Sequence, residues 1–104
     1  MLDRIIKLIQ LGQVVISDHG YDELAADGLM VSDIVSTIND SRMIEQYSDY
    51  TKGPCILVLQ KDRNGKPVHA VWRIPKGKTS PAVLVTAYRP EPKRWEKDFI
   101  RRKK

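Results

Sequence analysis

Two histidines, His19 and His69, are the residues of this chain best suited to acid–base chemistry near neutral pH. His69 lies in residues 66–74, KPVHAVWRI, whose alternation predicts a strand with His69 and Arg73 on one face and Trp72 on the other. A histidine that moves a proton and an arginine that holds negative charge suit a phosphate group. The alternative is a half-exposed sheet face with ordinary polar residues.

A second strand, expected over residues 82–88, carries Thr86 and Tyr88 on one face near its end. If this strand pairs with the strand of His69, Thr86 and Tyr88 join His69 and Arg73 on one surface. The alternative is an ordinary strand threonine followed by an amphipathic tyrosine at the strand end.

His19 stands at the expected start of a helix, beside Asp18, Asp22 and Glu23. The N–H groups of a helix start disfavour an imidazolium and the acidic neighbours favour it, so the direction of any pKa shift stays open. The ring is either a general acid or base, or an exposed histidine that begins a helix. These residues lack a metal-ligand spacing and the chain lacks a phosphate-cradling glycine loop, so we expect no metal and no cofactor.

The elements that must position these residues follow from periodicity. Helical spacing is seen over residues 1–11, again from Ser17 or Asp18 to Gly28, and from about Ser32 until Asn39 stops it. The period then changes to two, which predicts strands over residues 43–47, 55–61, 68–74 and 82–88, with a hairpin turn at residues 64–65. Residues 14–16 are expected to be a short extended link. The order predicts an α+β fold, with N-terminal helices packed on an antiparallel sheet of about four strands.

The length of 104 residues predicts one domain, in which residues 93–104 form a basic C-terminal helix or frayed tail. No apolar run approaches the roughly 20 residues of a membrane helix, and charges within residues 1–11 argue against a secretory signal. The single Cys55 excludes an internal disulfide. We therefore expect a soluble cytoplasmic protein without membrane contact.

Charge is divided unevenly between the two halves of the chain. Residues 1–52 hold four Lys/Arg and nine Asp/Glu, a net charge of −5, whereas residues 53–104 hold fourteen and four, a net charge of +10. Such asymmetry suggests a polyanionic partner such as nucleic acid for the basic half, with a solvated basic surface as the alternative.

Four motifs in fixed order carry a family resemblance: ISDHGYDELAADGL (16–29), DIVSTI (33–38), KPVHAVWRI (66–74) and LVTAYRPEPKRW (84–95). The chain resembles a family of small bacterial proteins catalogued as a domain of unknown function. That family is grouped with toxin-like ribonucleases of the RelE/barnase-type (BECR) fold, whose genes often lie beside an MqsA (YgiT-type) zinc-finger antitoxin. His19, His69, Thr86 and Tyr88 match the family pattern.

The resemblance implies metal-independent RNA cleavage, in which the ribose 2′-OH is the nucleophile and the enzyme supplies a base, an acid and cationic donors. His69 and His19 would share the proton transfers, Arg73 would stabilise charge, and Thr86 and Tyr88 would orient the RNA. The expected RNA contacts are Arg89, Lys76, Lys78, Lys93, Arg94 and Trp95, although Trp95 could instead dock the C-terminal segment on the sheet.

Many family members have arginine where this chain has Glu23 and Asp27, which removes positive charge from that helix. The implied protein is a type II toxin acting on mRNA, free or on the ribosome, and held inactive by a cognate antitoxin. The alternatives are a non-enzymatic RNA- or protein-binding module and an inactive family member. Self-association into a homodimer is also open.

Overall fold

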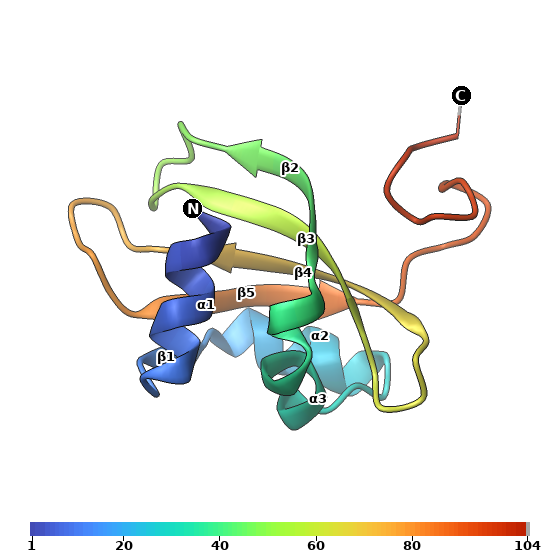
Figure 1. Ribbon diagram of the computed structural model, residues 1–104, viewed down its shortest axis with the longest axis horizontal. Helices are drawn as coiled ribbons and strands as arrows, with labels where there is room; N and C mark the ends of the chain where they lie inside the picture. The colour runs from blue at the N-terminus through green and yellow to red at the C-terminus, as the bar shows by residue number, and fades with distance from the viewer. Residues whose placement is uncertain (104) are drawn as a thin grey trace.

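A computed structural model describes residues 1–103 of the chain (Figure 1). Helices α1 (Leu2–Gln10), α2 (Asp18–Ala26) and α3 (Val31–Ser36) come first, with the short strand β1 (Val14–Ile16) between α1 and α2. A 3-10 turn at Ile38–Asp40 leads into the strands β2 (Arg42–Tyr47), β3 (Cys55–Lys61), β4 (Pro67–Arg73) and β5 (Ala82–Tyr88). The α+β class predicted from the periodicity is confirmed.

The sheet has one strand more than predicted, in the order β1-β5-β4-β3-β2. The extra strand is β1, which was expected to be only a link and which pairs with β5 in parallel, Val15 lying opposite Val83. The other pairs are antiparallel, so the sheet is mixed rather than wholly antiparallel. Three residues are too few to show alternation, and this pairing partner lies almost 70 residues away. Local pattern therefore could not reveal the strand.

Ser17 explains why α2 begins where it does. Its side-chain oxygen accepts a hydrogen bond of 2.9 Å from the backbone N–H of Gly20 and donates one of 2.8 Å to the carbonyl of Val85. The first bond caps the helix and the second ties the cap to β5. Helix α3 begins at Val31, with Met30 rather than Ser32 at the N-cap position, and no side chain caps it.

The three helices cover one face of the sheet, the face that carries Trp72 (Figure 1). Ile5, Leu24 and Ile34 of the helices join Ile56, Trp72 and Leu84 of the strands in one apolar cluster. Since strand side chains alternate, His69 and Arg73 point to the opposite, helix-free face. The core therefore orients β4 so that its candidate catalytic side chain lies away from the helices.

The C-terminal segment differs from both expected forms, since residues 93–103 make neither a helix nor a frayed tail. Residues 94–103 turn back on themselves, with Trp95 bridged to Arg102 and the N–H of Lys103 donating to the carbonyl of Arg94 over 2.9 Å. The segment curls beside the end of the sheet, away from the helices (Figure 1). Lys104, which was included in the predicted tail, lies outside the described residues. Within residues 1–103 no helix has the length and apolar character needed to cross a membrane.

Candidate functional site

His69 lies at the centre of a cluster on the helix-free face of the sheet. Its cross-strand partner in β5 is Tyr88, with the two ring centroids 5.7 Å apart, and the next same-face pair is Val71 with Thr86. The register therefore brings His69, Thr86 and Tyr88 onto one surface, the arrangement that was expected if these two strands paired. The His69 side chain is fully buried rather than half-exposed.

The C-terminal segment is what buries His69. The Trp95 ring stands edge-on to the imidazole at 4.5 Å between centroids, and His69 Nε2 lies 2.7 Å from the carbonyl oxygen of Phe99. Since a carbonyl only accepts, Nε2 carries the proton and donates. His69 Nδ1 is then an acceptor, and it is buried without a hydrogen-bond partner among the described residues. Trp95 is buried in this contact and presents no free face for a base to stack on.

Arg102 ties this segment to the far strand of the sheet. Its Nη2 lies 2.7 Å from Glu45 Oε1 in β2, and its guanidinium sits 4.6 Å from the centre of the Trp95 ring. Glu45 also accepts a hydrogen bond from the hydroxyl of Tyr47. A continuous chain of contacts therefore runs from Tyr47 through Glu45, Arg102 and Trp95 to His69.

The ionisation of these groups follows from their surroundings. Burial lowers the pKa of His69 below 6.5 and raises that of Tyr88 above 10.0. The hydrogen bonds from Tyr47 and Arg102 lower the pKa of Glu45, while burial and the Glu45 contact raise the pKa of Tyr47 to about 12. Near neutral pH the cluster holds a neutral imidazole, two protonated phenols and one carboxylate.

Arg73 lies on the same face but at its other end, opposite Cys55 of β3. It follows His69 by four positions along the strand, or about 13 Å between Cα atoms at the usual strand rise. The expectation that both side chains address one phosphate is therefore corrected, because they stand at opposite ends of the face. Arg73 Nε is buried and has no hydrogen-bond partner within residues 1–103.

A cavity of about 690 Å³ opens at this second end of the face. Its lining includes Cys55, Val71, Val85 and Thr86 of the sheet, together with Tyr47 and the start of the β2–β3 loop as far as Tyr50. We call it the Tyr50 cavity. Thr86 thus belongs both to the His69 surface and to the cavity.

His19 is not part of either feature. It lies in the first turn of α2 with 66% of its side chain exposed, and its Nε2 is 3.5 Å from Glu23 Oε1. It is absent from the lining of the Tyr50 cavity and from the contacts that surround His69. Sequence alone could not show that one histidine is buried and the other exposed.

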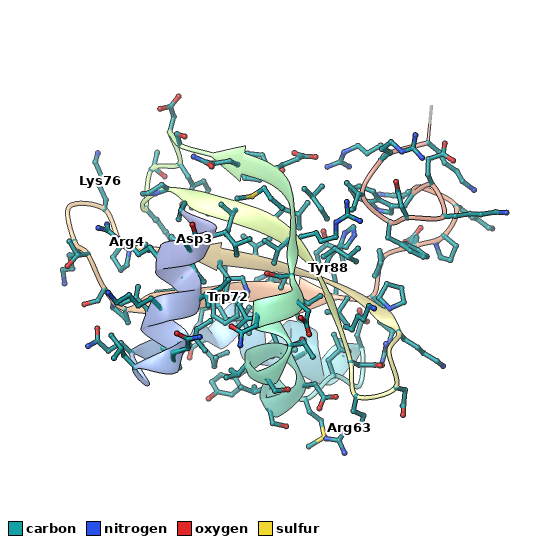
Figure 2. The ribbon with its side chains drawn as sticks, viewed as in Figure 1. Asp3, Arg4, Arg63, Trp72, Lys76 and Tyr88 are labelled. Atoms are coloured by element: carbon teal, nitrogen blue, oxygen red, sulfur yellow. The ribbon has the colours of Figure 1, made fainter. Side chains whose placement is uncertain are left out.

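The lysine and arginine candidates other than Arg89 lie in two regions. Lys76 and Lys78 are exposed in the β4–β5 loop, and Lys93 and Arg94 are exposed in the C-terminal segment. Figure 2 shows Lys76 projecting at the end of the molecule opposite Tyr88. The basic residues therefore flank both ends of the helix-free face.

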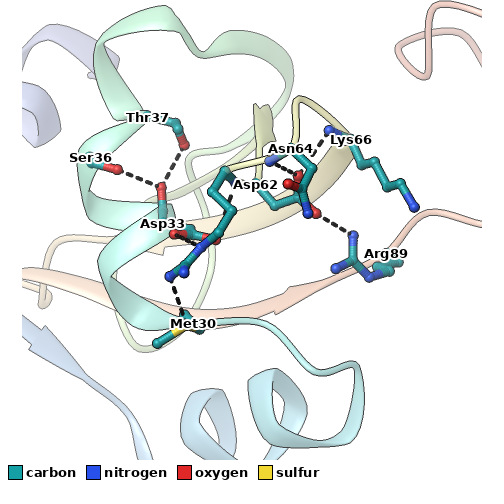
Figure 3. A network of polar contacts seen from close by, with 9 residues as sticks. Met30, Asp33, Ser36, Thr37, Asp62, Asn64, Lys66 and Arg89 are labelled. Carbon is teal, nitrogen blue, oxygen red and sulfur yellow. Dashed lines mark hydrogen bonds and ion pairs between the residues drawn. The ribbon is translucent and has the colours of Figure 1, made fainter.

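Arg89 is engaged in ion pairing that fixes the end of β5. Its Nη1 lies 3.0 Å from Oδ2 of Asp62, whose other oxygen accepts the backbone N–H groups of Asn64 and Lys66 in the hairpin turn (Figure 3). The backbone N–H of Arg89 donates to Asp27 over 2.8 Å. Asp27 therefore has a structural partner here, the backbone of Arg89 at the end of β5.

Glu45, Tyr47, Phe99 and Arg102 were not anticipated as part of the site. The alternation of Glu45 and Tyr47 along β2 was the available signal, since it places both on one face. The contribution of Phe99 is a backbone carbonyl, which no side-chain motif records. Among residues 1–103 no group of three or more His, Cys, Asp or Glu side chains is arranged to hold a metal ion.

One comparison with known proteins gives a match. The family described as Domain of unknown function (DUF4258) matches residues 16–89, which is well over half of the chain. The match runs from the end of β1 to the residue after β5, so it includes His19, His69, Thr86 and Tyr88. No curated protein and no solved structure matches the chain.

Proposed function

Since the chain belongs to the DUF4258 family, whose function is unknown, we propose a function from the chain's own residues: metal-independent cleavage of RNA, as the toxin of a type II toxin–antitoxin pair. The observation that carries the proposal is the pairing of His69 with Tyr88 on the helix-free face, with Thr86 beside them. The net charge of +10 on residues 53–104 suits an anionic substrate. The resemblance to RelE/barnase-type toxins points the same way.

In the proposed reaction His69 is the base. In the closed conformation the Nε2–H bond to the Phe99 carbonyl leaves Nδ1 as an unpartnered acceptor. Once the C-terminal segment is displaced, the neutral imidazole can take the proton of the ribose 2′-OH. The 2′-oxygen attacks phosphorus, the bond to the 5′-oxygen breaks, and a 2′,3′-cyclic phosphate forms. Tyr88, held protonated, is the group beside His69 that can return a proton to the leaving 5′-oxygen.

Substrate access requires the C-terminal segment to move. In the described conformation residues 94–103 cover His69 completely, so RNA or the ribosome must displace them. A cognate antitoxin, with a zinc-finger protein as the expected class, would control the active form by binding this face.

The test is cleavage of end-labelled RNA by the purified chain in excess EDTA, with His69→Gln and His19→Gln beside it. We expect products that end in 2′,3′-cyclic phosphate. His69→Gln should lower the rate at least about a hundredfold, the usual contribution of a general base. His19→Gln should change it less than about threefold, because His19 is exposed and outside the cluster. Absence of cleavage both with free RNA and with translating ribosomes would contradict the proposal.

The complete burial of His69 favours a second candidate, a non-enzymatic RNA-binding module. Such a module binds mainly through lysine and arginine, so its affinity falls steeply with salt. It would lose affinity gradually as basic residues are replaced and would be indifferent to His69→Gln. Binding without cleavage under all conditions favours this candidate.

A further inference from the structure

We infer that the Tyr50 cavity is a binding site for one unpaired base of single-stranded RNA, next to the proposed reacting centre. The inference rests on the proposed function only in taking RNA as the ligand. The cavity volume of about 690 Å³ lies within the range of sites that hold small organic ligands. It opens on the same face of the sheet as His69, and Thr86 is common to both.

The lining of the cavity suits a flat aromatic ring. Its floor contains the side chains of Cys55, Val71 and Val85, which offer an apolar surface. Its wall contains Tyr47 and Tyr50, which leave 40% and 47% of their surface exposed. Exposed aromatic rings at the edge of an apolar hollow are the usual platform for a nucleobase, because every base has a π-face that stacks on them.

The wall is held in place by the structure around it. Tyr47 is fixed by its hydrogen bond to Glu45, which also bonds to Arg102. The loop that carries Tyr50 is anchored at Gly53, whose N–H donates to the Tyr50 carbonyl over 3.0 Å. A site of this kind is largely formed before the ligand binds, which reduces the entropy lost on binding.

Asp49 is the one charged residue in the lining of the cavity, and cationic groups lie just beyond that lining. Arg73 lies across from Cys55 in the floor, and its buried Nε lacks a partner in the described part of the chain. The N–H of Lys76 donates to the carbonyl of Lys52 over 3.0 Å, which joins the β4–β5 loop to the loop of Tyr50. Lys76 also shares a shallow hollow with Tyr50. Phosphate oxygens are suitable hydrogen-bond acceptors for the cationic side chains of Arg73 and Lys76.

The apolar floor, the aromatic wall and the cationic groups beyond the lining together favour a nucleotide over an apolar peptide. An apolar peptide would use the floor but would bring no negative charge to Arg73 and Lys76 nearby. A nucleotide places its base on the floor and its phosphates beside the cationic groups, so it uses all three features.

Binding can be measured apart from cleavage with a fluorescein-labelled 2′-O-methyl oligoribonucleotide, which has no free 2′-OH to attack. We expect Tyr50→Ala to weaken binding about tenfold, the size of one lost base-stacking contact. Tyr50→Phe keeps the ring and should bind as the unaltered chain does. Tyr21→Ala is the matched control, because Tyr21 is 55% exposed on α2, outside the cavity. Circular dichroism establishes that each variant is folded.

A second probe tests whether the base itself is bound. The same oligomer without its bases should bind the unaltered chain about as weakly as the intact oligomer binds Tyr50→Ala, and Tyr50→Ala should weaken it no further. The inference fails if the intact and abasic oligomers bind with the same affinity. It also fails if Tyr50→Ala binds the oligomer as tightly as Tyr21→Ala does, or if the unaltered chain does not bind the oligomer. Cleavage in EDTA is scored separately, so base binding without cleavage would sustain the inference and contradict the ribonuclease. If RNA is cleaved and Tyr50→Ala changes neither cleavage nor binding, the ribonuclease proposal is sustained and the base-binding inference is contradicted.

Discussion

His69 Nε2 donates a 2.7 Å hydrogen bond to the carbonyl of Phe99, thirty residues later in the chain. Phe99 has a φ of 57°, in the left-handed region that costs a non-glycine residue about 1 kcal/mol. The contacts of Trp95 and Arg102 offset this local cost. The burial and the tautomer of the His69 imidazole therefore depend on whether the C-terminal segment stays in place.

Arg102→Ala should loosen the C-terminal segment. It removes a half-exposed ion pair with Glu45 and a cation–π contact with Trp95, together worth about 1 kcal/mol. The open population should rise about fivefold. Diethyl pyrocarbonate modifies neutral imidazoles that are accessible to it. It should then label His69 about five times faster, as measured by peptide mass spectrometry.

Two controls belong to that experiment. Arg101→Ala removes an exposed pair with Asp98 inside the segment and should leave the labelling rate of His69 unchanged. His19 is exposed in every variant and serves as the internal standard. Equal labelling of His69 in Arg101→Ala and Arg102→Ala would show that Glu45 does not hold the segment down.

The lowered pKa of His69 predicts that stability falls as the solution is acidified. The unfolded chain binds a proton near pH 6.5, while burial keeps the folded imidazole neutral to lower pH. The stabilising contribution is complete above pH 6.5 and is lost as pH falls through 6.5 toward the folded pKa, by at most about 1.4 kcal/mol per unit. The groups facing His69 do not titrate there, because the pKa of Glu45 is lowered and that of Tyr88 is raised; Arg102 stays charged.

Urea unfolding at pH 7.5, 6.5 and 5.5 measures this dependence. His69→Gln keeps a donor for the Phe99 carbonyl and removes the titration, so its stability should vary less over this range. A slope that survives in His69→Gln would assign it to another group.

Gly53→Ala tests the joint between the two loops beside the Tyr50 cavity. A Cβ at Gly53 would lie 2.1 Å from the Ile74 carbonyl and 2.7 Å from the Lys76 nitrogen, at a φ of +130°. We expect the free energy of unfolding to fall by at least about 3 kcal/mol. Gly77→Ala has a φ of +75° and open space, so it should cost only about 1 kcal/mol. Similar losses in both variants would mean that the close approach at Gly53 relaxes freely.

Local pattern predicted most of the fold because most elements carry a local signal. The predicted bounds of β3 and β5 match those observed, since long apolar and β-branched runs end at proline or charge. β1 was missed because its partner is distant, and α3 begins earlier than its best capping residue suggested. These differences come from tertiary contacts, which a local pattern does not contain.

The sequence predicted which strand residues of the candidate site share a face, but neither the register that brings them together nor the segment that covers them. Strand alternation put Thr86 and Tyr88 on one face of their strand and made their meeting with His69 conditional on strand pairing, and the observed register brings His69 opposite Tyr88. Burial of His69 depends on Trp95 and on a backbone carbonyl of a segment whose charge is typical of a solvated tail. The distance between Arg73 and His69 follows from their spacing in the sequence and the rise per residue of a strand, so it could have been predicted.

Gln60→Leu tests the polar contact that fixes β3 and β4 against the helices. Gln60 is almost fully buried, accepts a 2.8 Å hydrogen bond from Trp72 Nε1 and donates one of 2.6 Å to the Ile34 carbonyl. Leucine has a similar size but leaves that donor and that acceptor unpaired, which should cost about 3 kcal/mol in urea unfolding. Gln46→Leu, at an exposed site in β2, should change stability by less than about 0.5 kcal/mol. Because Trp72→Phe removes the stranded donor, the double variant Gln60→Leu/Trp72→Phe should lose less than the sum of the two single variants. Strict additivity would mean that the Trp72–Gln60 hydrogen bond contributes nothing to how the sheet sits on its helices.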